Sequence, residues 1–270
     1  MRAVPWVCGL LASLSIACSS FAGTVYDSGG FEPQRFSPGA LTGQDGGLWM
    51  DSGSGASAVV QTTTVASGTQ AVQVNRNDGD MRFFPMLPTT PAVQRFVFIN
   101  WDMNVSRTNL NNVVFGPFFG IEAYTPATTI LGAAGVDATT GDLLYEAPKT
   151  GILTETGTKV PFGKFNHYEL VIDNSAKNFS IYFNNKLIKK TSGFVDPGST
   201  GFSDADISAL AADLEPPTEK GTAFFDNYSV TTSNTGPGGR TIPLPPAVWP
   251  GLMTLGLGML LVRLRQVRRA

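Results

Sequence analysis

The sequence predicts an all-β domain, and three observations support this. Apolar and polar residues alternate along several short segments, which is the period of a strand with one buried and one wet face. Asn, Gly, Asp and Ser separate these segments and favour tight turns. Only 15% of the 270 residues are charged, a fraction too low for coiled coils or long solvated helices. We therefore expect short strands between residues 23 and 232.

The clearest strand covers residues 97–105. Polar Asn100, Asp102 and Asn104 occupy its even positions. One face of this strand should therefore lie in the core while the other carries polar groups. The apolar odd positions are Val97, Ile99, Trp101, Met103 and Val105.

Further strands are expected in hairpins. Residues 167–173 and 179–183 alternate in the same way on either side of a turn. Asn184-Asn185 forms the next tight turn, because Asn tolerates positive φ, and residues 186–191 return as another strand. Another hairpin is expected over 136–147, around Thr-Thr-Gly.

One helix is expected, in the segment that begins at Ser203. Ser203 and Asp206 have the spacing of a capping box, and Ile207, Leu210 and Leu214 follow at helical spacing. Many short strands with one minor helix predict a two-sheet jelly-roll β-sandwich.

The first 22 residues have the pattern of a secretory signal peptide. A positive start precedes a short apolar stretch, and Ser20-Phe21-Ala22 has small residues at both ends for cleavage after Ala22. Cys8 and Cys18 both lie in this segment, so we expect neither a disulfide nor a free thiol in the exported chain. A buried N-terminal helix and lipidation at Cys18 are the alternatives.

The C-terminal segment predicts a single transmembrane helix. Residues 245–262 carry no charge, and Arg263, Arg265, Arg268 and Arg269 follow. A helix of this length spans roughly 27 Å, close to a hydrocarbon core of about 30 Å. The positive-inside tendency keeps the arginines cytoplasmic and places everything upstream outside.

The charges are unevenly distributed along the chain. Residues 23–244 hold 14 Lys or Arg and all 21 Asp or Glu, a net charge of −7. Without a basic face to displace counterions from phosphates, we expect no nucleic-acid partner for this part. Residues 233–242, which are rich in Gly and Pro, predict a flexible linker before the C-terminal segment.

The tail over residues 243–270 has three parts in a fixed order. Pro243, Leu244 and Pro245 open it, a Gly- and Leu-rich apolar run follows, and an arginine cluster ends it. This order resembles a PEP-CTERM sorting domain, in the variant that opens with Pro-Leu-Pro. The resemblance implies a Gram-negative bacterial protein that an exosortase-type enzyme processes and delivers to the cell surface or extracellular matrix. A plain single-pass anchor that is never processed is the alternative.

The domain between these segments also carries short motifs. Gly30-Phe31-Glu32 and Trp49 lie near its start, residues 67–72 follow, and residues 224–230 close it. The arrangement resembles jelly-roll carbohydrate-binding modules and concanavalin-A-like lectin and glucanase domains.

Asp226 is a candidate metal ligand. Strand alternation places it on one face with Phe224, Tyr228 and Val230, where an unpaired carboxylate needs a cation or strong donors. Calcium suits it, because calcium takes carboxylate oxygens. The resemblance to carbohydrate-binding modules implies that Glu32 and Asp226 hold a structural calcium ion. The alternative is that Asp226 accepts hydrogen bonds from backbone amides or an arginine.

Sugar recognition would use exposed aromatic side chains that stack on sugar rings. Trp49, Tyr124 and Tyr145 lie in stretches that could form loops or strand edges, and they are the candidate ligand-binding residues. A place in the core is the alternative for each.

Catalysis has little support in the sequence. A glycosidase needs two carboxylates about 5–10 Å apart, and no strand carries the Glu-x-Asp-x-x-Glu pattern of many jelly-roll glucanases. Helix capping explains Asp204 and Asp206, and His167 has no partnered nucleophile. We therefore expect no enzyme and no catalytic residue.

The expected function is that of a membrane-tethered or surface-sorted, non-catalytic protein of the bacterial envelope. It would have a structural role or bind extracellular polysaccharide. The alternative is an extracellular glycan-degrading enzyme of a jelly-roll glucanase-like class.

Overall fold

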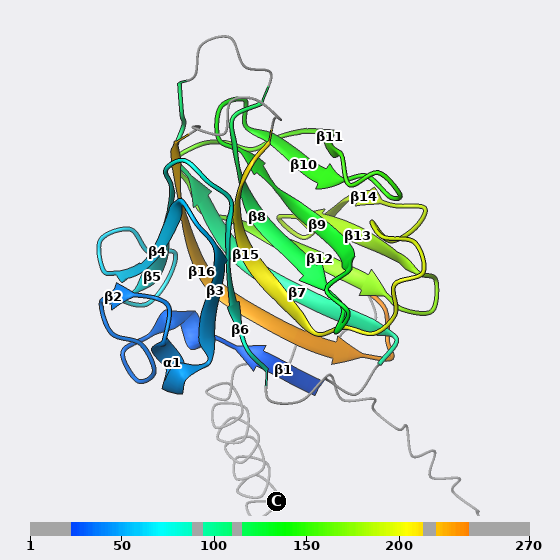
Figure 1. The fold of residues 1–270 in the computed structure, drawn as a ribbon, viewed down its shortest axis with the longest axis horizontal. Coiled ribbons are helices and arrows are strands. Elements are labelled where there is room, and N and C mark those ends of the chain that lie inside the picture. The colour runs from blue at the N-terminus through cyan, green and yellow to red at the C-terminus, as the bar shows by residue number, and fades with distance from the viewer. Residues whose placement is uncertain (1–22, 88–93, 110–114, 213–219, 238–270) are drawn as a thin grey trace, which may run out of the picture. The chain divides into compact units, whose positions relative to one another are not determined.

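Two β-sheets packed face to face form the domain (Figure 1). The computed structural model describes residues 23–87, 94–109, 115–212 and 220–237. The segment 1–22, the tripeptide that opens the sorting tail and the arginine cluster lie outside these residues. Within the described ranges, no helix is long and apolar enough to cross a membrane.

The first sheet, sheet A, contains nine strands in the described part of the chain. Their order across the sheet is β14 (Lys186–Lys190), β13 (Asn178–Phe183), β12 (Asn166–Asp173), β7 (Phe96–Val105), β16 (Gly221–Ser233), β5 (Ala71–Arg76), β4 (Ala56–Gln61) and β2 (Gly39–Ala40), and β1 (Gly23–Asp27) also pairs with β16. All pairs are antiparallel.

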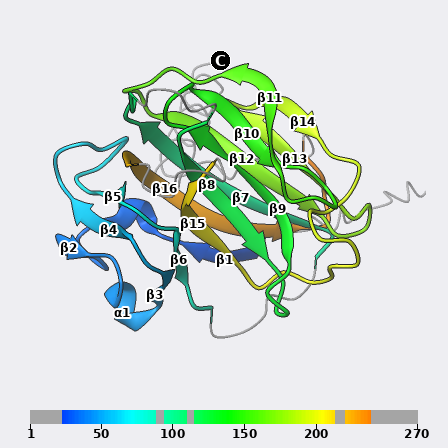
Figure 2. The ribbon, with the colours of Figure 1, turned by 45° about the horizontal axis from the view of Figure 1, so that its top comes forward.

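The second sheet, sheet B, contains seven strands among the described residues. Their order is β11 (Leu153–Lys159), β10 (Asp142–Glu146), β9 (Ile130–Asp137), β8 (Pro117–Tyr124), β15 (Asp204–Ala211), β6 (Met81–Pro85) and β3 (Trp49–Gly53). The edge strands of the two sheets lie near each other. β2 and β3 are at one side of the sandwich, and β14 and β11 are at the other (Figure 2).

The structure confirms an all-β sandwich with very little helix. The strand expected at 97–105 is β7, and the expected hairpins are β9–β10, β12–β13 and β13–β14. Asn184 and Asn185 form the last hairpin's turn with φ values of 48° and 64°, the left-handed pair that such a turn requires.

The helix expected after Ser203 is wrong. Asp204–Ala211 forms β15, which pairs with β8 on one side and β6 on the other. Residues 204–209 alternate between polar and apolar as a strand does, but Ile207, Leu210 and Leu214 also fit a helical spacing. Both faces of β15 are buried, and a short buried strand cannot be told from a helix by periodicity alone. The described helices are the short elements η1 (Gly29–Phe31) and α1 (Gln44–Gly47).

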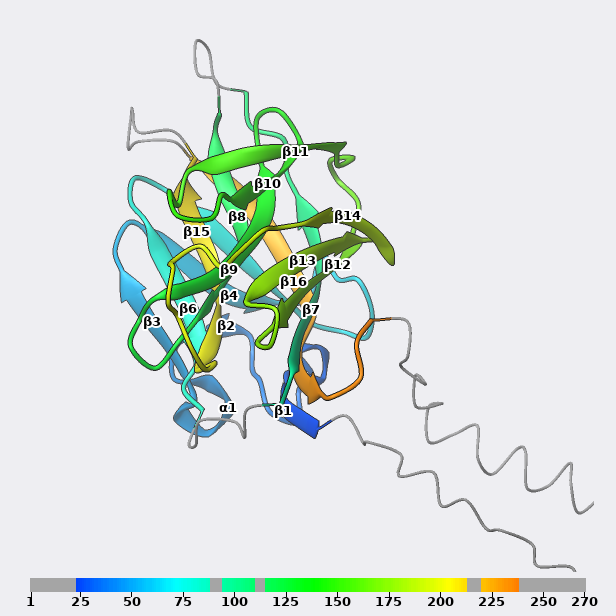
Figure 3. The same cartoon turned by 90° about the vertical axis from the view of Figure 1, so that its right-hand side faces the viewer.

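The core fills the space between the sheets, which Figure 3 shows from the side. Trp101 stacks on Tyr168 with ring centroids 5.4 Å apart and an angle of 10° between the planes. The fully buried residues that meet across the sheets include Ile99, Leu170, Phe225, Phe119, Ile121 and Ile207. The expected apolar face of β7 is therefore the core face.

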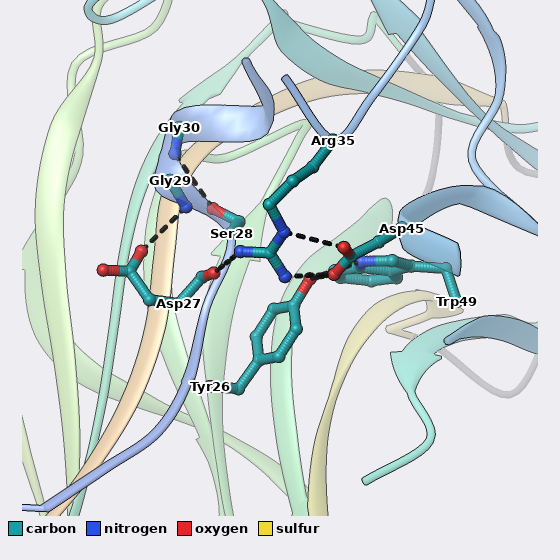
Figure 4. A network of polar contacts seen from close by, with 8 residues as sticks. All are labelled: Tyr26, Asp27, Ser28, Gly29, Gly30, Arg35, Asp45 and Trp49. Atoms are coloured by element: carbon teal, nitrogen blue, oxygen red, sulfur yellow. Dashed lines mark hydrogen bonds and ion pairs between the residues drawn. The ribbon is translucent and has the colours of Figure 1, made fainter. Parts of the chain in front are cut away.

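A hydrogen-bond network ties the N-terminal segment to this core (Figure 4). The indole N–H of Trp49 donates to the Tyr26 hydroxyl at 2.8 Å, and that hydroxyl donates to Asp45 Oδ2 at 2.8 Å. Arg35 donates to both carboxylate oxygens of Asp45 and to the backbone carbonyl of Asp27. Burial and the hydrogen bond to Asp45 raise the pKa of Tyr26, so its hydroxyl keeps the proton that it donates.

Replacing Tyr26 with Phe should lower the free energy of unfolding by about 1–3 kcal/mol, because the buried Trp49 N–H would lose its acceptor. Urea unfolding followed by tryptophan fluorescence measures this loss. Tyr182→Phe is the matched control, since Tyr182 is only half-buried on the outer face of sheet A. Equal losses in the two variants would contradict the role of the network.

Candidate functional site

The outer face of sheet B carries polar residues that are nevertheless buried. Along β8, Ile121 and Ala123 point into the core, so Glu122 and Tyr124 point away from it. On β15, Ala205 and Ile207 point inward in the same way, so Asp206 lies on the outer face. We call this cluster of titratable residues the sheet B site.

Four residues of neighbouring strands lie in one row across the sheet B site. Glu122 pairs with Ala133 of β9 on one side and with Asp206 of β15 on the other. The register of β10 aligns Glu146 with Ala133. Since strands lie about 4.8 Å apart, the backbones of Glu122 and Glu146 are about 10 Å apart, and their side chains meet above the small Ala133.

Glu122 is the centre of the sheet B site. Its side chain is 0% exposed. Arg82 Nε donates to Glu122 Oε2 at 2.7 Å, an Arg82 Nη donates to Oε1 at 3.1 Å, and the Ser208 hydroxyl donates to Oε2 at 2.5 Å. Burial lowers the pKa of Arg82, but attraction to Glu122 outweighs it, so the pKa is raised above its ordinary value and Arg82 stays charged. Arg82 and Glu122 therefore form a buried ion pair.

Glu146 holds a proton beside this pair. Burial, the negative charge of Glu122 and a side-chain hydrogen bond with Glu122 raise the pKa of Glu146 to about 8. One carboxylic acid and one carboxylate then share a proton, as expected for like charges that cannot both ionise in contact. Glu146 Oε2 is buried without a hydrogen-bond partner among the described residues. At neutral pH the sheet B site thus offers a carboxylic acid.

A second carboxyl pair adjoins this one on β15. Burial, then the negative charges of Asp204 and Glu122, raise the pKa of Asp206 well above its ordinary value. Asp204 is half-buried, accepts from the Ser203 hydroxyl at 2.9 Å and is hydrogen-bonded to Asp206. The explanation of these two aspartates by helix capping is therefore wrong, because they are strand residues that face the sheet B site.

Tyr124 and Arg82 lie on the accessible side of the site. Arg82 Nε donates to the Tyr124 hydroxyl at 2.8 Å, and the Arg82 side chain is 29% exposed. Burial and the charge of Glu122 raise the pKa of Tyr124, so it remains a phenol. Of the three aromatic residues predicted to bind a ligand, Tyr124 is the one that the structure brings to the site.

An apolar cluster borders the sheet B site on the same face. It consists of Phe118, Leu144 and Leu210. The ring of Phe118 lies across Gly120 and Gly135, where a Cβ atom would approach it to 2.8 and 2.5 Å. These glycines allow the ring to lie flat on the sheet, and the resulting apolar wall helps keep water from the carboxyl groups.

The other two aromatic candidates are core residues. Trp49 is 0% exposed, and its ring packs against Tyr26, Phe31 and Tyr228. Tyr145 points between the sheets, is 7% exposed, and has the Lys189 ammonium 4.9 Å from its ring centroid. Neither ring has a face open to a sugar. The prediction that Trp49 and Tyr145 bind a ligand is therefore wrong, and both are core residues.

Glu32 and Asp226 accept hydrogen bonds from one loop. Glu32 accepts from the backbone N–H of Thr69 at 2.7 Å, and Asp226 accepts from Ala66 and Ser67 N–H at 2.9 and 3.1 Å. A Cβ atom on Gly30 would lie 3.5 Å from Asp226 Oδ1 and 3.8 Å from Glu32 Cγ, so the two acids flank Gly30. No group of three or more His, Cys, Asp or Glu within the described ranges could hold a metal ion.

The face predicted for Asp226 is wrong because β16 contains a bulge. Asp226 pairs with Asp102 and Ser229 with Asn100, so β16 has one residue more than β7 over this stretch. Asn227 absorbs the extra residue at φ 51°. Tyr228 and Val230 therefore enter the core, whereas Asp226 lies on the other face of the strand.

The bulge also builds a polar cluster on the outer face of sheet A. Asn227 Nδ2 donates to Asp102 Oδ2 at 2.7 Å, and Asp102 Oδ1 lies 2.9 Å from His167 Nδ1. The hydrogen bond to Asp102 raises the pKa of His167. The Ser67 hydroxyl donates to Asn227 Oδ1 at 3.0 Å. These hydrogen bonds account for the polar residues on the outer face of β7 and β12.

Comparison with solved structures shows a shared fold. No protein-family model and no curated protein sequence matches this chain. The chain superposes on the conserved carbohydrate esterase of the Shiga toxin-encoding bacteriophage phi24B with a TM-score of 0.51 at 13% identity, over 79% of this chain and 100% of that chain. A sialidase gives 0.51 at 9% identity, over 78% of this chain and 19% of that one. An alginate lyase from Chlorella virus gives 0.48 at 13% identity, over 73% and 99% of the two chains.

These comparisons correct the expectation that the chain is not an enzyme. Two proteins named for carbohydrate chemistry, a carbohydrate esterase and a sialidase, share this sandwich fold. The search for two carboxylates on one strand also missed the sheet B site, because its acids come from β8, β10 and β15. The prediction that the chain is not an enzyme is therefore wrong.

The raised pKa of Glu146 predicts that stability falls as pH rises from 5 to 8. Over this window the folded chain holds a proton that the unfolded chain has released, at a cost of up to about 1.4 kcal/mol per pH unit. Glu146→Gln keeps a donor to Glu122 without the titration, so the variant should be similar to the natural protein at pH 5 and more stable at pH 8, by up to about 3–4 kcal/mol.

Urea unfolding at pH 5, 6, 7 and 8 measures this difference between the two proteins. His167, whose raised pKa changes stability in the same direction, is present in both and cancels. Glu155→Gln, at an exposed position of β11, should follow the natural protein at each pH. Parallel curves for Glu146→Gln and the natural protein would show that Glu146 carries no extra proton.

Proposed function

We propose that this protein is an extracellular glycan-degrading enzyme and that the sheet B site is its active site. The observation that carries the proposal is the contact between the buried carboxyl groups of Glu146 and Glu122, which raises the pKa of Glu146, beside the partly exposed Arg82 that is paired with Glu122. Cleavage of a glycosidic bond requires a proton for the leaving oxygen, and a carboxylic acid with a pKa near the working pH is the usual donor.

Each residue of the sheet B site has a separate role in this proposal. Glu146 donates its proton to the leaving oxygen as the glycosidic C–O bond breaks. A water molecule then adds to the sugar carbon and returns a proton to Glu146. Glu122, fixed by Arg82 and Ser208, is a positioning residue that keeps Glu146 protonated at neutral pH. Arg82 and Tyr124, on the accessible side, bind sugar hydroxyl groups through their N–H and O–H donors.

A structural calcium ion near Gly30 is a second proposal for this chain. The Asp226 carboxylate and the Cγ of Glu32 flank Gly30. Each carboxylate has oxygen lone pairs beyond those used by the 66–70 loop. Backbone carbonyls would have to supply further ligands, because calcium takes six to eight oxygens. The ion would fasten the N-terminal segment to β16.

We also propose that the enzyme is exported and sorted to the cell surface through its tail, starting from the patterns of residues 1–22 and 243–270. Export would place the sheet B site among extracellular polysaccharides.

Replacing Glu146 with Gln should lower the release of reducing ends from polysaccharide by about 10²–10⁴-fold, because the amide cannot donate a proton to the leaving oxygen. The assay incubates purified full-length protein with a panel of neutral and acidic polysaccharides at pH 7 and measures new reducing ends. Glu155→Gln is the matched control and should retain full activity. Equal activity of both variants, or no release by the natural protein, would contradict the proposal.

Calcium should raise the thermal unfolding midpoint of the full-length protein if Glu32 and Asp226 bind it, since a ligand at 100 times its Kd stabilises by about 2.7 kcal/mol. Differential scanning calorimetry with calcium, magnesium or chelator measures the shift. Asp226→Asn should abolish the calcium-dependent part, whereas Asp51→Asn, at an exposed position of β3, should keep it. No shift in the natural protein would refute the calcium site.

A further inference from the structure

A cavity of about 280 Å³ opens where three loops meet. The loops follow β10, join β12 to β13, and follow β14. Its lining residues are Pro148, Lys149, Lys177, Gly193, Phe194 and Pro197, with Ser192 and Gly198. The volume lies just below the usual range of about 300–1,000 Å³ for small-molecule pockets, which suits one sugar unit or its charged substituent.

Two lysines supply the charge of this cavity. Lys149 and Lys177 are both exposed, and neither has an ion-pair partner among the salt bridges of the described residues. The nearby acids are engaged elsewhere. Asp173 accepts from Ser175 and Ala176 N–H and from Arg95, and Asp196 Oδ2 accepts from Ile130 N–H at 2.7 Å. Two ammonium groups without a salt-bridge partner among the described residues therefore line this cavity, within a domain of net negative charge.

The backbone at both lysines is unusual. Lys149 has a φ of 72° and Lys177 a φ of 51°, the left-handed region that costs a non-glycine residue roughly 1 kcal/mol or more and that Gly or Asn adopts more readily. The conformation of Lys149 is fixed by its backbone N–H, which donates to Val195 O at 2.7 Å. Lysine side chains thus occur at two turn positions where the backbone favours another residue type, and both line the same cavity.

The cavity begins close to the sheet B site. Lys149 follows Glu146 by three residues, and Asp196, beside the lining residue Pro197, is near enough to contribute to the raised pKa of Glu146. A chain bound at the sheet B site could therefore place a neighbouring sugar at the cavity.

We propose that this cavity binds a carboxylate or sulfate group of an acidic polysaccharide, and that Lys149 and Lys177 are its ligands. The choice of a saccharide as the carrier of the anion rests on the proposed function. The anionic group itself follows from the two unpaired ammonium groups, which have donors and no acceptor.

The test measures binding by full-length Glu146→Gln protein, so that turnover does not affect the result. The probes are dextran sulfate with uncharged dextran as its matched control, and polygalacturonate with its methyl ester. We expect binding to one or both charged members and at least tenfold weaker binding to the uncharged members at low salt. The charged member that binds more tightly identifies the anion as sulfate or carboxylate.

Lys149→Gln with Lys177→Gln should weaken binding of the charged probe about tenfold and reduce its dependence on salt. Lys164→Gln, at an exposed lysine in another loop, should change it less than twofold, and circular dichroism checks that all variants are folded. Equal binding of charged and uncharged probes, or equal weakening by Lys164→Gln, would overturn the anion site. If the natural protein cleaves uncharged glycans and the two lysines do not matter, the proposed function holds and the anion site does not. If binding depends on the lysines but no polysaccharide is cleaved, the anion site holds and the proposed function does not.

Discussion

Burial of acidic groups on the outer face of sheet B is the constraint on which the site depends. Glu122, Glu146 and Asp206 come from three strands and face one charged side chain, Arg82. One cation cannot balance three carboxylates without water. Protonation removes the remaining charge, which is why burial raises the pKa of Glu146 and Asp206 and leaves the Glu122 carboxylate paired with Arg82. The carboxyl groups of Glu146 and Asp206 on the outer face of sheet B therefore keep their protons at a higher pH than exposed carboxyl groups do.

The same burial determines what the sequence could predict. In sheet A, β7 and β12 have one core face and one face with polar groups, so Trp101 and Asp102, or Tyr168 and His167, alternate visibly. In sheet B, every residue of β10 is buried, as are nearly all of β8, β9 and β15. Without a wet face the period of two disappears in β8, β9 and β10. In β15 the alternation persists over 204–209, but the segment fits a helical spacing as well, so the sequence favours a helix there. The fold could be predicted from sheet A, whereas the site lies on the sheet whose pattern is hidden.

Asp226 shows how far local reasoning reaches. Its need for partners followed from its apolar neighbours and is met by Ala66 and Ser67 N–H. The face on which it lies depended on a bulge of one residue, which flips the side chains that follow. No pattern near Asp226 indicates that the loop 160 residues earlier supplies its donors, because that contact depends on the order of strands in the sheet.

The net charge counted from the sequence overstates the negative charge that the domain presents to a ligand, because several of its acids are buried. The net charge of −7 for residues 23–244 counts Glu146 and Asp206 as ionised, but both have raised pKa values and little contact with water. Glu122 is neutralised by Arg82 at 2.7 Å. These acids therefore repel an approaching anion less than their number implies, while Lys149 and Lys177 remain exposed at the rim. A negatively charged domain can thus bind an acidic chain at its loops, where the unpaired cations are, and present protonated carboxyls to it on the adjoining sheet.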